Sequence, residues 1–174
     1  MSYSISAYFS QEKIAELTLD EKTGLLNLAY NSAWQQQGFA LSPCLTLDNL
    51  FSASSVYNFL DNQLPEGKAR ELLAQNLGVN EKQIFPQIRQ LGSDLSGAIQ
   101  FQSSQEVFDE KPLFRPIYAD ELIKRLDHKE TAGLLHWDEK PRLSVAGVQD
   151  KLNVFVDVSG EIGLGDGSLC STHI

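Results

Sequence analysis

The sequence is poor in the residues that cross-link or metallate small proteins, because it holds only two cysteines and three histidines. Cys44 and Cys170 lie far apart and form neither a C-x-x-C pair nor a Cys/His ligand spacing, so we expect reduced thiols in a cytoplasmic protein. His128, His136 and His173 are equally scattered. Without an H-x-x-x-H spacing or a G-x-S-x-G element they support neither a metal site nor a hydrolase triad.

Positive charge and long apolar runs are also scarce. The 174 residues carry a formal net charge of −9 at pH 7, with a pI of about 4.7. No general positive field would attract DNA or an anionic membrane surface, so direct DNA binding is not expected. No apolar run approaches the roughly 20 residues that span a bilayer, and the N-terminus lacks the pattern of a signal peptide. We therefore expect no membrane association.

Strand periodicity dominates the beginning of the chain, which is 42% hydrophobic overall and can bury one core or two small ones. Apolar residues alternate with polar ones over residues 3–30, and Thr23 and Gly24 supply a turn before the last apolar run. This pattern predicts an antiparallel meander. A further short strand is expected at residues 98–101.

From residue 52 the apolar period becomes helical. Ser54 or Ser55 is expected to cap the first helix, and residues 62–67 interrupt the pattern. The next apolar stripe can end at Gly78 as a left-handed residue, and the one after it stops at Gly92. Short helices beside a small antiparallel sheet predict an α+β fold for residues 1–102.

Residues 103–116 read as a connection, because the stretch is polar, contains two prolines and has no period. A helix is expected at about residues 120–126. Strand alternation returns at residues 152–158, and a turn at residues 159–160 leads into another strand at residues 161–164. Residues 117–174 are therefore predicted to form a second, β-rich part.

Residues 142–151 (RLSVAGVQDK) form the only sharply small-residue turn between predicted strands. Small residues there let backbone N–H groups approach phosphate oxygens without side-chain collision. The segment has no G-x-x-x-x-G-K-[ST] and no G-x-G-x-x-G, which excludes a Walker-type loop, a Rossmann site and the ordinary protein-kinase loop. On composition alone, a plain hairpin turn is the simpler interpretation.

Five motifs in a fixed order change that interpretation. They are GFALSP at 38–43, NFLDNQLPEG at 58–67, LGSDLSGA at 91–98, SVAGVQDKL at 144–152 and STHI at 171–174. Their order and spacing resemble the HipA family of serine/threonine kinase toxins over nearly the whole chain. The resemblance implies HipA N-terminal subdomain 1 at residues 1–102 and the truncated start of a kinase-like N-lobe at residues 117–174.

The resemblance also implies roles within the loop. Ser144 occupies a position that family members autophosphorylate, and a phosphoserine adds roughly −1.5 to −2 charges beside a site for triphosphate, which would repel ATP. A serine bonded to its own turn backbone is an equally compatible interpretation. Lys151 either neutralises a phosphate or points to solvent. The implied ATP-binding residues are Ala146, Gly147, Val148, Gln149, Asp150 and Lys151.

In the family the groups that perform phosphoryl transfer lie C-terminal to residue 174, namely a phosphate-binding lysine, a catalytic aspartate and metal-binding Asp/Asn residues. We therefore expect no catalytic residue here, no kinase activity from this chain alone, and ATP and Mg²⁺ only in the full-length protein. The implied partners are a HipB-like helix-turn-helix antitoxin, DNA only through that antitoxin, and a protein substrate such as an aminoacyl-tRNA synthetase.

A second function stays open, namely a stand-alone regulatory or interaction module that restrains a separately encoded HipA-like kinase. The missing catalytic lobe favours the module, whereas the phosphate loop argues against it, because a binding module has no need of that loop. Other candidate residues have structural explanations. Asp61 and Glu66 suit turn and helix-end roles, and Trp34 and Trp137 suit core or interface anchors.

Overall fold

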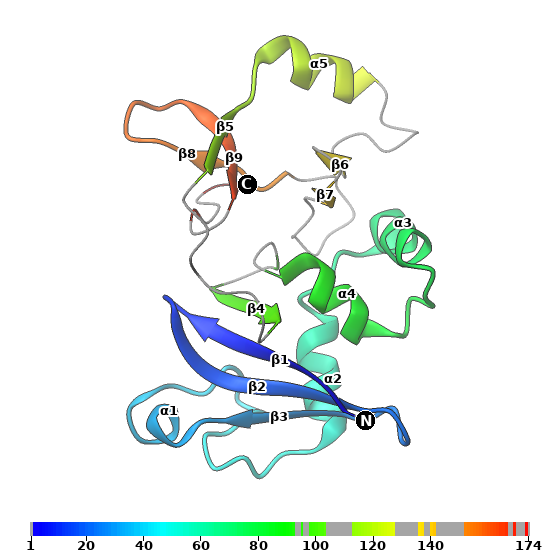
Figure 1. The fold of residues 1–174 in the computed structure, drawn as a ribbon, viewed down its shortest axis with the longest axis vertical. Coiled ribbons are helices and arrows are strands. Elements are labelled where there is room, and N and C mark those ends of the chain that lie inside the picture. The colour runs from blue at the N-terminus through cyan, green and yellow to red at the C-terminus, as the bar shows by residue number, and fades with distance from the viewer. Residues whose placement is uncertain are drawn as a thin grey trace.

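The structure, a computed structural model, describes residues 2–92, 95, 98–103, 113–127, 136–137, 140–141, 152–166, 169 and 173. Figure 1 shows a sheet with helices in residues 2–103 and a smaller, β-rich group in residues 113–166. The predicted α+β class is confirmed. Within the described ranges, no helix combines the length and hydropathy needed to cross a bilayer.

A four-stranded antiparallel sheet is the base of the first group, and its strands lie in the order β3-β2-β1-β4. The predicted meander is confirmed. Cross-strand register places Ile5 opposite Leu17, and Leu17 opposite Leu28, so that one buried row crosses the sheet. The strands are β1 (Ser2–Phe9), β2 (Glu12–Asp20), β3 (Leu26–Tyr30) and β4 (Ile99–Ser103).

The helices begin and end at residues with identifiable caps. The predicted cap at Ser54 or Ser55 is wrong, because Ser52 is still extended and its hydroxyl accepts the N–H of Ser55 at 3.1 Å. Helix α3 ends at Gly78 in the left-handed conformation, with φ of 64°, as predicted. Helix α4 also ends at Gly92 as predicted, but with φ of 53° and ψ of −106°, outside the left-handed helical region. The helices are α1 (Ser32–Gln37), α2 (Ala53–Asp61), α3 (Gly67–Leu77) and α4 (Ile84–Leu91).

The core of this group lies between the sheet and the helices. Helix α2 packs against β3, α4 packs against β4, and α3 packs against α4. Leu60 of α2 and Ile88 of α4 are fully buried in the same apolar cluster as Ile5 and Leu17. Helix α1 was not predicted, because its six residues are too short to show a helical period.

Tyr30 fastens the long connection between α1 and α2. Its hydroxyl donates to the Leu45 carbonyl at 2.8 Å and accepts the Leu41 N–H at 2.9 Å, and burial raises the pKa of this phenol. The Asn49 side chain accepts the Tyr30 N–H at 2.9 Å. The same connection carries Gly38, where a Cβ would lie 2.4 Å from the Trp34 ring. The GFALSP motif thus has a packing role.

The second group contains a three-stranded sheet in the order β5-β9-β8, a helix and a two-stranded hairpin. Its elements are β5 (Leu113–Pro116), α5 (Ala119–Asp127), β6 (His136–Trp137), β7 (Lys140–Pro141), β8 (Phe155–Val156) and β9 (Ile162–Asp166). Strand β5 lies inside the stretch predicted as a connection, and it pairs with the distant β9. The division into domains at residues 102 and 117 stays a prediction.

The strand predicted at residues 152–158 is shorter than expected. Only Phe155 and Val156 pair within β8, and Asp157 begins a turn by accepting the N–H groups of Ser159 and Glu161 at 2.8 Å. Val158, at the end of the predicted strand, is fully exposed in that turn. The turn at residues 159–160 is confirmed, with φ of 85° at Gly160.

The core assignment predicts that Leu60→Ala lowers the free energy of unfolding by about 2–5 kcal/mol, because Leu60 is 0% exposed and its loss leaves a cavity. Urea unfolding followed by circular dichroism measures the change. Leu50→Ala is the matched control, since Leu50 is 82% exposed and its truncation should cost no more than about 0.5 kcal/mol. Equal losses from both variants would contradict the assignment.

Candidate functional site

The residues predicted to carry chemistry lie outside the described residues. They are Ser144, Ala146, Gly147, Val148, Gln149, Asp150 and Lys151. The structure does describe both flanks of the segment 142–151, since β7 ends at Pro141 and the description resumes at Leu152.

The flank after the segment is fastened to the three-stranded sheet. Val154 and His173 exchange two backbone hydrogen bonds of 2.9 Å, and β8 pairs with β9. The Phe155 ring meets the Phe114 ring of β5 edge to face, with centroids 5.9 Å apart. Gly163 permits this packing, because a Cβ there would lie 2.4 Å from the Phe114 ring.

The flank before the segment is fastened by Trp137. This side chain is fully buried, although it belongs to a hairpin of only two paired positions on each strand. The guanidinium carbon of Arg125 lies 4.0 Å from the centre of the Trp137 ring, and that of Arg115 lies 5.6 Å away. Among the described residues, the buried Trp137 Nε1–H has no hydrogen-bond partner. The described polar contacts of this side chain are those of its ring with the guanidinium groups of Arg115 and Arg125.

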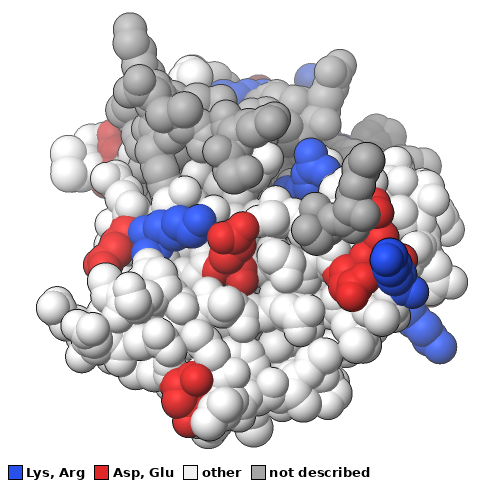
Figure 2. Space-filling model, turned by 60° about the horizontal axis from the view of Figure 1, so that its bottom comes forward, with Lys and Arg blue, Asp and Glu red and all other residues white. Residues whose placement is uncertain are grey.

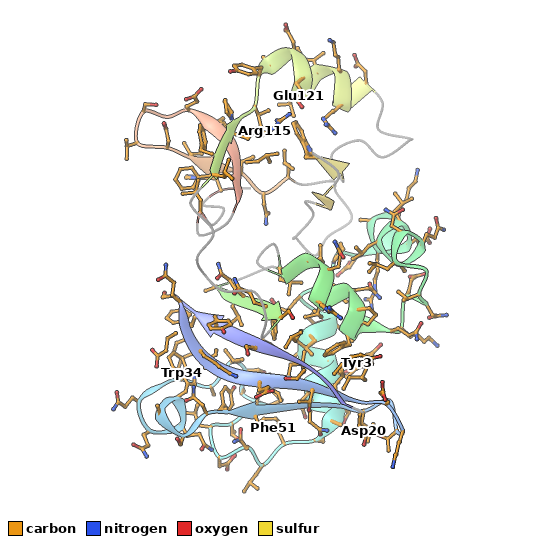
Figure 3. The ribbon with its side chains drawn as sticks, viewed as in Figure 1. Tyr3, Asp20, Trp34, Phe51, Arg115 and Glu121 are labelled. Atoms are coloured by element: carbon orange, nitrogen blue, oxygen red, sulfur yellow. The ribbon has the colours of Figure 1, made fainter. Side chains whose placement is uncertain are left out.

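Glu121 joins the two arginines. It accepts hydrogen bonds from Arg115 at 2.8 and 3.2 Å, and Nη2 of Arg125 lies 3.6 Å from the same carboxylate. Figure 3 shows Arg115 and Glu121 side by side between β5 and α5. We call Arg115, Glu121, Arg125 and Trp137 the arginine–tryptophan cluster.

The hydrogen bonds from Arg115, followed by the attraction of both guanidinium groups, hold the pKa of Glu121 below its usual range. Glu121 therefore stays ionised at neutral pH and suits an anchoring role better than proton transfer. Sequence reasoning missed the cluster. Its only local signal is the i,i+4 spacing of Glu121 and Arg125, because Arg115 comes from a strand and Trp137 from a hairpin.

Asp61 has a structural role. Its carboxylate accepts a 2.6 Å charged hydrogen bond from Arg70 of α3, and Arg70 also donates to the Glu81 carbonyl at 2.9 Å. Gln87 of α4 donates to that same carbonyl at 2.9 Å. These bonds hold the ends of α2, α3 and α4 together, while Glu66 precedes α3 without making a side-chain cap.

The remaining candidates do not come together. His136 lies in β6 and His173 in the Val154 bridge, Cys44 is exposed, and His128 and Cys170 fall outside the described residues. Across the parts that the structure describes, no three His, Cys, Asp or Glu side chains gather as metal ligands.

Two surface features of the described residues carry charged side chains. A hollow of about 630 Å³ opens beside the β2–β3 turn and the start of α4, and its charged lining is mixed, with Asp20 and Glu21 facing the same space as Lys82 and Arg89. Figure 2 shows the face below the sheet, where the described Lys and Arg side chains lie singly or beside Asp and Glu. Neither feature is a basic patch of the kind that binds nucleic acid.

Comparison with known proteins identifies the first group. A family model described as the HipA N-terminal domain matches residues 5–102. The serine/threonine-protein kinase toxin HipA of Shewanella oneidensis is 42% identical over 161 residues, which cover 92% of this chain and 37% of that protein. The putative kinase Y4mE of Sinorhizobium fredii is 30% identical over 178 residues, which cover 98% of this chain and 42% of that protein.

A solved structure shows the same fold. A chain in the complex of HipA, HipB and operator DNA from Shewanella oneidensis MR-1 superposes with a TM-score of 0.79 at 37% sequence identity. The match covers 97% of this chain and 39% of that chain. The present chain therefore spans about two fifths of the length of the relatives that it matches.

Glu121 gives a pH-dependent prediction. The pKa of Glu121 in the folded protein lies below the ordinary value of 4.5. The ionised carboxylate therefore stabilises the fold above that pH, and this stabilisation is lost as the pH falls through the folded pKa. At pH 7, Glu121→Gln should destabilise β5 and α5 by less than about 1 kcal/mol, since the side chain is 27% exposed. The difference in free energy of unfolding between the wild-type protein and Glu121→Gln should shrink below pH 4.5.

The measurement is a urea titration at pH 7 and again at acid pH, followed through the indole NMR signal of Trp137. Glu71→Gln is the control, because Glu71 is an exposed glutamate on α3. If Glu121→Gln loses the same free energy of unfolding at both pH values, the ionised carboxylate is not the form through which Glu121 stabilises the fold.

Proposed function

The chain belongs to the HipA N-terminal domain family, and on this premise we propose that it is the N-terminal part of a serine/threonine protein kinase of a toxin–antitoxin system. The observation that carries the proposal is the 42% identity to a HipA kinase toxin over 92% of the chain. That likeness extends beyond the family model at residues 5–102 and into the second group.

Within this function we assign the segment 142–151 to the phosphates of ATP. Strands flank it on both sides, and backbone N–H groups of a small-residue turn between strands suit phosphate oxygens. Residues 146–150 are proposed to supply those donors, and Lys151 immediately precedes Leu152 in the sequence. When bound, ATP with Mg²⁺ supplies the phosphoryl group, and this chain contributes its positioning rather than its transfer.

Ser144 is assigned as the regulatory phosphorylation position. It lies three residues after Pro141, the last residue of β7, and two residues before the first proposed phosphate-contacting residue, Ala146. A phosphoserine here places about −1.5 to −2 charges next to the proposed triphosphate. Like charges repel, so this modification disfavours ATP and supports self-limitation of the kinase.

The proposed partner is a HipB-like helix-turn-helix antitoxin. The structural relative was solved as a complex of HipA, HipB and operator DNA. The net charge of −9 on this chain favours a DNA contact through the antitoxin rather than a direct one. A protein substrate such as an aminoacyl-tRNA synthetase and a cytoplasmic location complete the proposal.

One observation favours the second candidate, a module that restrains a separately encoded kinase. Residues 2–103 bury their own apolar cluster between sheet and helices, so this group has the interior of an independent folding unit. The proposal of a kinase part nevertheless accounts for more of the chain, since the likeness to the kinase toxin continues through the second group.

The function is tested on the full-length gene product. Calorimetry should show binding of ATP with Mg²⁺, and mass spectrometry should find phosphate on Ser144. Ser144→Ala should remove that phosphate and preserve ATP binding, because the hydroxyl rather than the loop backbone is changed.

Ser159→Ala is the control, since this serine lies in the exposed β8–β9 turn. The 174-residue chain alone should remain unphosphorylated. If the full-length protein neither binds ATP nor carries phosphate, the kinase proposal fails and the module remains.

A further inference from the structure

We propose that helix α3 is a hinged flap and that Arg70 is the clasp that holds it closed. Helix α3 lies beyond α4 at the periphery of the first group, and it packs against α4 (Figure 1). Its residues take no part in the ATP site proposed above, so the flap and that site are independent features of the chain.

Glycines in the left-handed region mark both ends of the flap. Gly67 has a φ of 58° and Gly78 has a φ of 64°. A Cβ at either position would meet no atom of the described residues within 4 Å, so the glycines serve the backbone angle rather than a close contact. Hinges are formed by a few residues at element ends that absorb a change in φ and ψ. Helix α3 therefore has a candidate hinge at each end.

Arg70 bridges both hinges from inside the flap. Its Nη2 amino group donates to the Asp61 carboxylate, at the end of α2, at 2.6 Å and to the Glu81 carbonyl, in the α3–α4 connection, at 2.9 Å. The first of these bonds joins opposite charges, which makes it the stronger kind. The Arg70 side chain is only 15% exposed, so solvent screens the pair less than a surface ion pair.

The clasp also gives a role to the motif NFLDNQLPEG at residues 58–67. Asp61 supplies the carboxylate that Arg70 binds, and Gly67 supplies the first hinge. Leu64 lies between them and is 0% exposed, so it anchors the connection in the apolar cluster. One short segment thus combines the acceptor of the clasp, a fixed point and a hinge.

The closed position leaves polar atoms of the clasp unsatisfied. Gln87 of α4 is buried and donates to the same Glu81 carbonyl at 2.9 Å. Among the described residues, neither Gln87 Oε1 nor Arg70 Nε has a hydrogen-bond partner. Opening returns Arg70 to water, whereas closure buries Leu73 and Ala74. Because these effects oppose each other, the flap opens at a lower free energy than the whole group unfolds.

The first test is hydrogen–deuterium exchange of the full-length protein, read by mass spectrometry on peptides from α2 and α3. A released helix of 11 residues is not stable in water, so its amides exchange once the flap opens. Arg70→Met should accelerate exchange in α3 about tenfold and change exchange in α2 less than about twofold, because it removes a charged hydrogen bond from the flap alone.

Lys68→Met is the matched control, because Lys68 is an exposed cation on the same helix. It should leave exchange in α3 unchanged. Arg70→Lys should accelerate exchange in α3 about threefold, since the shorter lysine keeps the charge but lacks the forked donors of arginine. If Arg70→Met does not fold, Arg70→Lys decides the test. Unchanged exchange in α3, or equal acceleration in α2 and α3, would overturn the flap.

The second test isolates the charged bond to Asp61. Raising NaCl from about 0.05 to 0.5 M should accelerate exchange in α3 of the wild-type protein about twofold relative to α2, because salt weakens the attraction between Arg70 and Asp61. Arg70→Met should lose this salt effect. A salt effect of equal size in Arg70→Met would show that other charges carry it, and it would overturn the part assigned to Asp61.

Discussion

The pairing register between β1 and β2 is the constraint on which the first group depends. It places Ile5 opposite Leu17, and a slip of one residue would turn every apolar side chain of a strand to the other face. A bulge after Ala7 adjusts that register, so that the consecutive residues Ile14 and Ala15 are both buried. Helices α2 and α4 can then close a single interior against the sheet.

The second group is held together in a different way. Among its described residues, only Trp137 and Leu164 are buried apolar side chains, whereas the first group has a large apolar cluster. Charged and aromatic contacts also hold this group together. Glu121 lies between two arginines, and the Phe114 ring lies against Gly163 and meets the Phe155 ring edge to face. Directional contacts of this kind fix the placement of a chain segment more than they add stability.

Sequence reasoning succeeded where the signal was local. Gly78 and Gly92 ended helices as expected, and residues 62–67 separated α2 from α3, because glycine and proline act on the backbone of their own neighbours. It failed for β5, whose partner β9 lies about fifty residues later, and for the arginine–tryptophan cluster, which joins three elements. The α+β class and the family were predicted correctly, whereas the roles of residues 144–151 stay predictions.

Strand β4 returns to β1 after all four helices of the first group, and this order has a consequence for synthesis on the ribosome. Residues 99–103 cover the outer edge of residues 5–9. At roughly 5–20 residues per second, that edge emerges about ten seconds before its partner exists. A nascent chain carries an open strand during this interval, and such edges recruit other strands. The exposure ends only when translation has passed Ser103, which makes early chaperone engagement valuable to this fold.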